Sequence, residues 1–113
     1  EQIIQRARDI ARRGVAVLVR SAFLEGVDRY NNLFSISPPT LVAQFSERVI
    51  MHKGILRDPN KEYLDERTGT MKRPSTATSY TWLVWIVGMA PQPMVWIPPC
   101  RRILERQGDY PNA

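Results

Sequence analysis

The sequence predicts an α/β fold, and three observations carry that prediction. The segment Tyr80–Val87 is apolar at nearly every position, so a strand formed there would be apolar on both of its faces. Such a strand belongs in the middle of a sheet that is covered on both sides. Val15–Val19 is a second continuous apolar run, rich in β-branched residues and typical of a buried parallel strand. Residues 1–13 carry a helical pattern, and a helix followed by a buried strand is the second half of a βαβ unit.

The first elements follow from the spacing of apolar residues and from helix-ending residues. Residues 1–13 place their apolar side chains on one helical face, and we expect Gly14 to end that helix. No capping residue precedes the helix, so we expect its natural start to lie upstream. Residues 21–34 predict a second short helix, and prolines follow it. Residues 41–46 predict a strand whose pattern continues through residues 48–50.

The remaining segments are shorter and are separated by glycines and prolines. Residues 51–74 are polar, and we expect a long mobile loop there; loops of this length tend to be functional or disordered. Residues 88–93 predict a turn after the aromatic strand, and residues 94–97 a short antiparallel return strand. Residues 101–107 have room for at most two helical turns. We therefore expect one partial α/β domain over residues 1–113.

Composition narrows the classes of function. The chain of 113 residues has a formal net charge of +5 and a pI near 9.9, which fits a soluble surface and an anionic partner equally well. The single cysteine, Cys100, excludes an internal disulfide and a thiolate metal cage. There is no apolar run long enough to span a bilayer and no signal peptide, so we expect a cytoplasmic protein that binds no membrane.

Catalytic motifs are almost absent from the sequence. His52 is the one histidine, with no metal-ligand spacing around it, and Cys100 has no histidine near it in sequence. There is no Gly-x-Gly-x-x-Gly motif and no phosphate-binding loop. We expect no catalytic residue, no metal and no cofactor for this chain, and the residues alone indicate only a basic α/β protein.

The order of several segments nevertheless resembles the C-terminal half of the S-adenosylmethionine-dependent methyltransferase-like proteins of phages and prophages, which are similar to adenine-N6 DNA methyltransferases. The matching segments are Phe-Leu-Glu-Gly at 23–26 with Arg29, Pro39, Leu41-Val42, Arg48-Val49, the run from Ala77 to Trp85, and Trp96-Ile97-Pro98-Pro99.

The resemblance implies a doubly wound, Rossmann-like sheet in which the seventh strand is antiparallel and inserted between the fifth and the sixth. Val15–Val19 resembles the fifth strand of that family, Leu41–Ser46 the sixth and Tyr80–Val87 the seventh. The family's cofactor, S-adenosylmethionine, is held by a glycine-rich loop, and its target amine is oriented by an Asn-Pro-Pro-aromatic motif. Both are expected before Glu1 and neither is in this sequence, so we expect the chain alone to be inactive.

In doubly wound sheets ligands sit beyond the carboxyl ends of the parallel strands. The resemblance therefore implies that a nucleic-acid or substrate cleft lies near basic side chains and one aromatic side chain that could stack on an extruded base. These candidates are Arg20, Phe23, Arg29, Arg48, Lys53, Lys72 and Arg73.

Each candidate also has a purely structural interpretation. Phe23 is expected in the core more often than at a ligand, and Arg29 is one helical turn from Glu25, with which it would pair. The charges of residues 51–74 fit a solvated surface. The tryptophans of the aromatic strand fit packing better than a base-stacking platform.

Three hypotheses remain open at this stage. The chain is the substrate-side half of a methyltransferase-like domain, or a non-catalytic module that binds nucleic acid or protein, or a remnant that folds by self-association. Any nucleic-acid binding is expected to be weak and salt-sensitive. Because the strand at Val15–Val19 would have one unpaired edge, we expect a homo-oligomer or a complementary half-domain to cover that edge.

Overall fold

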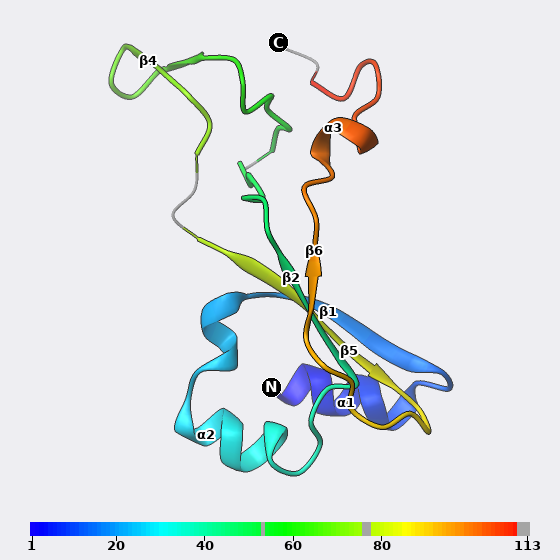
Figure 1. The fold of residues 1–113 in the computed structure, drawn as a ribbon. Coiled ribbons are helices and arrows are strands. Elements are labelled where there is room, and N and C mark those ends of the chain that lie inside the picture. Colours follow the sequence, from blue (N-terminus) through cyan, green and yellow to red (C-terminus); the bar gives the residue numbers. More distant parts are fainter. Residues whose placement is uncertain (53, 76–77, 111–113) are drawn as a thin grey trace.

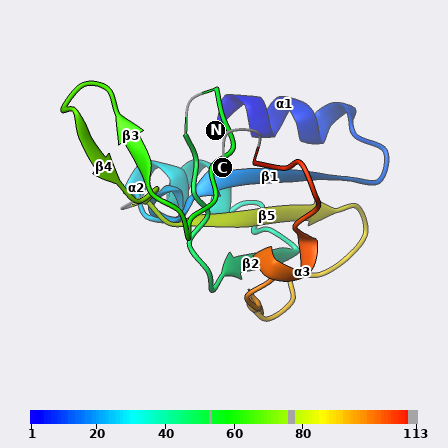
Figure 2. The ribbon, with the colours of Figure 1, turned by 90° about the horizontal axis from the view of Figure 1, so that it is seen from above.

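The computed structural model describes residues 1–52, 54–75 and 78–110. Its centre is a four-stranded mixed sheet in the order β1-β5-β2-β6. The strands are β1 (Gly14–Arg20), β5 (Tyr80–Ile86), β2 (Leu41–Phe45) and β6 (Val95–Ile97). Figure 2 shows β5 lying between β1 and β2.

The central strand β5 runs antiparallel to both of its neighbours. Ala16 of β1 and Leu41 of β2 both lie opposite Val84, one on each side. Strands β1 and β2 are therefore parallel to each other, although β5 separates them. This placement confirms the prediction that the aromatic segment forms an antiparallel strand inserted between two parallel ones. Strand β1 pairs with β5 from Tyr80 to Ile86, and β2 pairs with it from Thr81 to Val84.

The return strand runs antiparallel to β5, as predicted, but it is not the hairpin partner of β5. Residues 94–97 were expected to fold back beside β5, but β6 instead pairs with β2 in parallel, with Ala43 opposite Val95 and Phe45 opposite Ile97. The reason is that both edges of β5 are already occupied by β1 and β2. The chain turns at Gly88, whose φ is 79°, and crosses the start of β2, where the Gln92 amide donates to the Thr40 carbonyl over 2.7 Å.

The hydrophobic core lies on one face of the sheet. Helix α1 (Gln2–Ile10) places Ile4 there, and a π-helical turn η2 (Tyr30–Phe34) places Leu33 there, both against Leu83 and Trp85 of β5. All four side chains are buried. The two helical segments lie below the sheet in Figure 1.

The opposite face of the sheet is less covered. It exposes Leu18 of β1, Ile86 of β5 and Val95 of β6, each about two-fifths accessible to solvent. A doubly wound sheet carries helices on both faces, whereas the core of the described residues forms on one face only. The architecture is thus α/β with a mixed sheet and few helices.

Two helical predictions need correction. Helix α1 ends at Ile10 rather than at Gly14, which is instead the first residue of β1. The segment 21–34 is not one helix: it is a 3₁₀ turn η1 (Ser21–Leu24), a short helix α2 (Val27–Arg29) and η2. The break falls at Gly26, whose φ of 150° no helix accommodates.

The segment 51–74 is more ordered than a plain loop. It contains a hairpin of β3 (Tyr63–Asp65) and β4 (Thr70–Lys72), closed by a hydrogen bond of 2.7 Å from the Gly69 amide to the Asp65 carbonyl. Residues 48–50 form no strand, since β2 ends at Phe45. Helix α3 (Arg101–Leu104) is a single turn. Across the described parts of the chain, no helix has the length and apolar character needed to cross a membrane.

Candidate functional site

The carboxyl ends of β1, β2 and β6 meet at one end of the sheet, because these three strands run in the same direction. Gln44 fixes this end: its side-chain amide donates to the Tyr80 carbonyl over 3.0 Å and its oxygen accepts from the Ser21 hydroxyl over 3.0 Å. The Ser46 amide and hydroxyl both donate to the Ile97 carbonyl. Side-chain hydrogen bonds therefore link neighbouring strands at this end of the sheet, which is the end that receives ligands in doubly wound folds.

Two cavities open beyond this end of the sheet. The larger has a volume of about 260 Å³ and lies between the end of β2, residues 56–57 and the segment from α3 to Tyr110. The smaller, about 120 Å³, lies between residues 45–49 and the start of β5. Arg48 lines both cavities.

The walls of the larger cavity combine an apolar surface with a balanced set of charges. Three arginines and three carboxylates face it, so it does not have the strong positive charge of a phosphate pocket. The apolar side chains are Phe45, Val49, Ile50, Leu56 and Leu104, and the charged ones are Arg48, Arg57, Arg101, Glu47, Glu105 and Asp109.

A chain of polar contacts runs along one wall of this cavity. The Glu47 carboxylate accepts hydrogen bonds from the backbone amides of Cys100, at 3.3 Å, and Arg101, at 3.0 Å, which are otherwise unbonded at the start of α3. The Arg101 guanidinium lies 3.7 Å from Glu47 and 3.4 Å from Glu105. The Tyr110 hydroxyl donates to the same Glu105 carboxylate over 2.8 Å.

Tyr110 is the side chain of this wall whose ionisation is most altered. Burial raises the pKa of Tyr110 to about 12, and the hydrogen bond to the negative Glu105 adds to the rise. Its phenol is therefore a neutral donor throughout the physiological range and is not poised to act as a base.

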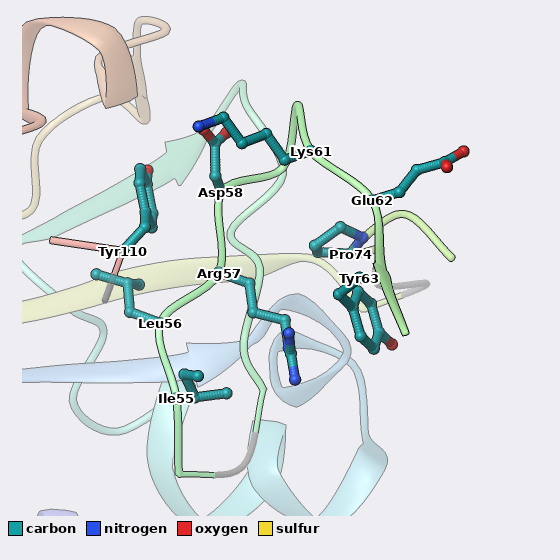
Figure 3. Close-up of a pocket in the computed structure, with 9 residues that line it drawn as sticks. All are labelled: Ile55, Leu56, Arg57, Asp58, Lys61, Glu62, Tyr63, Pro74 and Tyr110. Atoms are coloured by element: carbon teal, nitrogen blue, oxygen red, sulfur yellow. The ribbon is translucent and has the colours of Figure 1, made fainter. Parts of the chain in front are cut away.

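Arg57 stands between the larger cavity and a small adjoining one. Its guanidinium lies 3.9 Å from the centre of the Tyr63 ring, a cation–π contact, and Figure 3 shows the side chain pointing toward that ring. Its Nε is buried and has no hydrogen-bond partner among the described residues. The small cavity, lined by Pro74, Tyr110 and their neighbours in Figure 3, has a volume of about 20 Å³, enough for a water molecule but not for a ligand.

The structure brings two of the predicted site residues to this edge. Arg20 is the last residue of β1, is exposed, and lies opposite Tyr80. Arg48 is exposed and lines the smaller cavity together with that tyrosine.

Phe23 and Arg29 form a separate structural cluster. The ring of Phe23 packs edge-on against Phe34 with centroids 6.1 Å apart and belongs to the margin of the core. The Arg29 guanidinium covers the same ring at 4.6 Å and donates to the Glu25 backbone carbonyl over 2.7 Å. Arg29 thus bonds to Glu25 as expected, but to the main-chain carbonyl of Glu25 rather than to its carboxylate. The side chains of Phe23 and Arg29 are both held in this packing.

Lys72 and Arg73 belong to the hairpin. Lys72 makes an ion pair of 2.7 Å with Asp65 across the two strands, and Arg73 is exposed just after β4. Figure 1 shows this hairpin projecting away from the sheet, apart from α3. Lys53 lies outside the described residues.

Sequence reasoning missed most of the cavity wall, including Glu47, Arg57, Arg101, Glu105 and Tyr110. One signal was available, because Arg101 and Glu105 have the i, i+4 spacing of a helical ion pair. The contact between Arg101 and Glu47 had no such signal in the sequence, because it joins residues more than fifty positions apart.

No reactive constellation accompanies these side chains. The described part of the chain has no group of three or more His, Cys, Asp or Glu side chains able to hold a metal ion. His52 packs edge-on against Tyr63, and Cys100 is a half-buried free thiol on the cavity wall. Comparison with protein-family models, with curated proteins and with solved structures found no match to this chain.

Proposed function

We propose that this chain is the substrate-side half of a methyltransferase-like domain, and that the whole domain transfers a methyl group from S-adenosylmethionine to adenine in nucleic acid. The observation that carries the proposal is the placement of β5, antiparallel between two mutually parallel strands. That arrangement is the one that the resemblance in sequence implies for the fifth, seventh and sixth strands.

In this proposal the larger cavity receives the extruded target base. A base is planar and uncharged, and the cavity offers apolar walls with an even balance of charges. The guanidinium groups supply hydrogen-bond donors at its rim. Arg20, exposed at the same end of the sheet, would contact the phosphate backbone.

The chain's own contribution is binding rather than methyl transfer. The sequence holds neither a glycine-rich cofactor loop nor an Asn-Pro-Pro-aromatic motif. Calorimetry of this chain with S-adenosylmethionine is expected to show no binding. Micromolar binding would contradict the assignment of the cofactor site to another part of the domain.

The binding test uses neighbouring residues of α3 as a matched pair. Leu104 lines the cavity, whereas Ile103 does not line it and is 82% exposed. Fluorescence anisotropy should show tighter binding of a DNA duplex with one unpaired adenine than of the same duplex with an abasic site. Leu104→Trp should remove that preference by filling the cavity, and Ile103→Trp should keep it. Equal affinity for the two duplexes in the parent chain would refute the base-binding role.

The second candidate is a non-catalytic module that binds nucleic acid or protein. The observation that favours it is that the described residues contain no cluster of His, Cys, Asp and Glu able to hold a metal ion, whereas exposed arginines lie at the edge. This function predicts the same affinity for both duplexes with a steep loss on adding salt. The coding sequence upstream of Glu1 also separates the two, since an Asn-Pro-Pro-aromatic motif there supports the methyltransferase parent.

A further inference from the structure

The two edges of the main sheet differ in how well they are protected. Strand β6 has three residues and is flanked by Pro93, Pro98 and Pro99, which prevent another strand from pairing there. Strand β1 has seven residues and no proline, and within the described parts of the chain it pairs on one side only. An edge of that length is a template for a further strand.

The backbone groups on the open side of β1 can be identified from the neighbouring hydrogen bonds. The Ser21 amide donates to the Ser79 carbonyl of the next strand, and the Arg13 carbonyl accepts from the Val87 amide, both over 2.9 Å. Because the bonding direction alternates along a strand, the odd-numbered residues face β5. The amides and carbonyls of Gly14, Ala16, Leu18 and Arg20 therefore point outward.

Helix α1 presents an apolar flank on the same side as this edge. Its inner flank is fixed by two contacts: the Arg8 guanidinium lies 5.9 Å from the Trp85 ring of β5, and the Gln5 side chain donates to the Asn32 carbonyl over 3.2 Å. At 100° per residue, Ile3 and Ile10 lie on the opposite flank, beyond the buried Ile4. They are 82% and 66% exposed.

We propose that a second copy of this chain occupies the edge, with the two β1 strands antiparallel about a two-fold axis at Val17. In that register Ala16 lies opposite Leu18 of the other copy, and Gly14 opposite its Arg20. Each outward-pointing residue thereby meets another outward-pointing residue, so all of the open amides and carbonyls of β1 find partners. The contact is the same surface on both copies, as two-fold symmetry requires.

The side chains of β1 suit this register. Ala16 and Leu18 form apolar cross-strand pairs, and Arg20 faces a glycine rather than a like charge. Val15, Val17 and Val19 are only half-buried in one copy, on the face that α1 covers. The Ile3 and Ile10 flank of each helix would pack against these valines of the other copy. The sheet becomes eight-stranded. The proposal concerns this chain by itself, because in the whole domain of the proposed function a preceding strand would take the same edge of β1.

Cysteine cross-linking tests the register. In a Cys100→Ser background, Val17→Cys places the two thiols on the axis in a non-hydrogen-bonded pair, whose short Cα separation suits a disulfide. Ala16→Cys, whose opposite residue is Leu18, is the matched control. We expect a covalent dimer under mild oxidation for Val17→Cys and little for Ala16→Cys. The reverse pattern, or no dimer for either, would refute the two-fold axis at Val17.

Sedimentation tests the role of the helix flank. The parent chain should dimerise in the micromolar range, and Ile3→Lys with Ile10→Lys should weaken the dimer by roughly tenfold or more. Because both side chains are largely exposed in one copy, circular dichroism should show an intact fold. Ile103→Lys, equally exposed on α3, should leave the dimer unchanged. A parent chain that stays monomeric, or a dimer indifferent to the Ile3 and Ile10 changes, would overturn the proposal.

Discussion

The indole N–H of Trp85 donates to the backbone carbonyl of Ser37 over 2.9 Å. This bond joins the centre of the sheet to the segment between η2 and β2, and it gives the one polar atom of a 5% exposed side chain a partner. The aromatic strand is thus anchored by packing and by a specific hydrogen bond, and Trp85 is not available to stack on a ligand.

Trp85→Phe should destabilise the fold. The change leaves the Ser37 carbonyl without its donor and removes part of a buried ring, at a cost of about 1–3 kcal/mol. Trp96 is 66% exposed, so Trp96→Phe should change the free energy of unfolding by no more than about 0.5 kcal/mol. Urea unfolding of the two variants measures the difference. Equal effects would show that Trp85 is not a core residue.

Gly14→Ala should also destabilise the fold, although alanine usually stabilises a strand relative to glycine. A Cβ at position 14 would collide with the backbone carbonyl of Trp85, which is held in the β1–β5 ladder. We expect a loss of about 1–3 kcal/mol on chemical unfolding. The control Ala16→Gly should lose roughly 0.5–1 kcal/mol from strand propensity alone. An increase in stability for Gly14→Ala would show that the strands can move apart freely.

Tyr110 should lose its proton only well above the ordinary tyrosine pKa of 10.0. Its folded-state pKa of about 12 lies above the ordinary value of 10.0, so the fold favours the neutral phenol. The stability it contributes is present below pH 10 and is lost as the pH rises toward 12. Absorbance titration of tyrosinate should resolve one late group, and Glu105→Gln should lower its pKa while burial keeps it above the ordinary value. Tyr30→Phe, at an exposed position, should leave the late group in place.

The hairpin should loosen in acid. The ion pair with Lys72 and the hydrogen bond from the Arg67 amide hold the pKa of Asp65 below its ordinary value of 3.8. Its contribution to hairpin stability is therefore present above that value and is lost as the pH falls through the lowered folded pKa. Amide exchange measured by NMR should show faster exchange at Gly69 in Asp65→Asn at neutral pH. Asp9→Asn in α1 should have no effect on the hairpin, and a hairpin unchanged in Asp65→Asn would contradict this role.

The central part of the fold could be predicted because its sequence signals are local. Both-face apolarity placed Tyr80–Val87 inside the sheet, where β5 takes all but its last residue. Helical spacing placed Ile4 on the apolar face of the first helix, and that residue packs in the core. The partner of β6 could not be predicted in the same way, because it depends on which edges of β5 remain open after β1 and β2 have paired. The hairpin was missed because three-residue strands such as Tyr63–Asp65 are too short to show an alternating pattern.

The candidate site was less predictable than the sheet. The resemblance placed Arg20 and Arg48 at the carboxyl ends of parallel strands, and in the structure Arg20 is the last residue of β1 and Arg48 follows β2. The cavity wall requires α3 and Tyr110 to lie beside the end of β2, which follows from the parallel pairing of β6. Lys72 instead pairs with Asp65 of the same hairpin, and neither residue lines the cavities at the edge.

The position of β5 has a consequence for how the protein is made. Strands β1 and β2 emerge early from the ribosome, yet neither pairs with the other, because each pairs with β5. Val17 of β1 and Val42 of β2 both lie opposite Leu83 of β5, which is synthesised later than either of them. Neither strand can therefore pair with β5, their shared neighbour, until residue 86 has left the exit tunnel, and the sheet then closes through contacts distant in sequence.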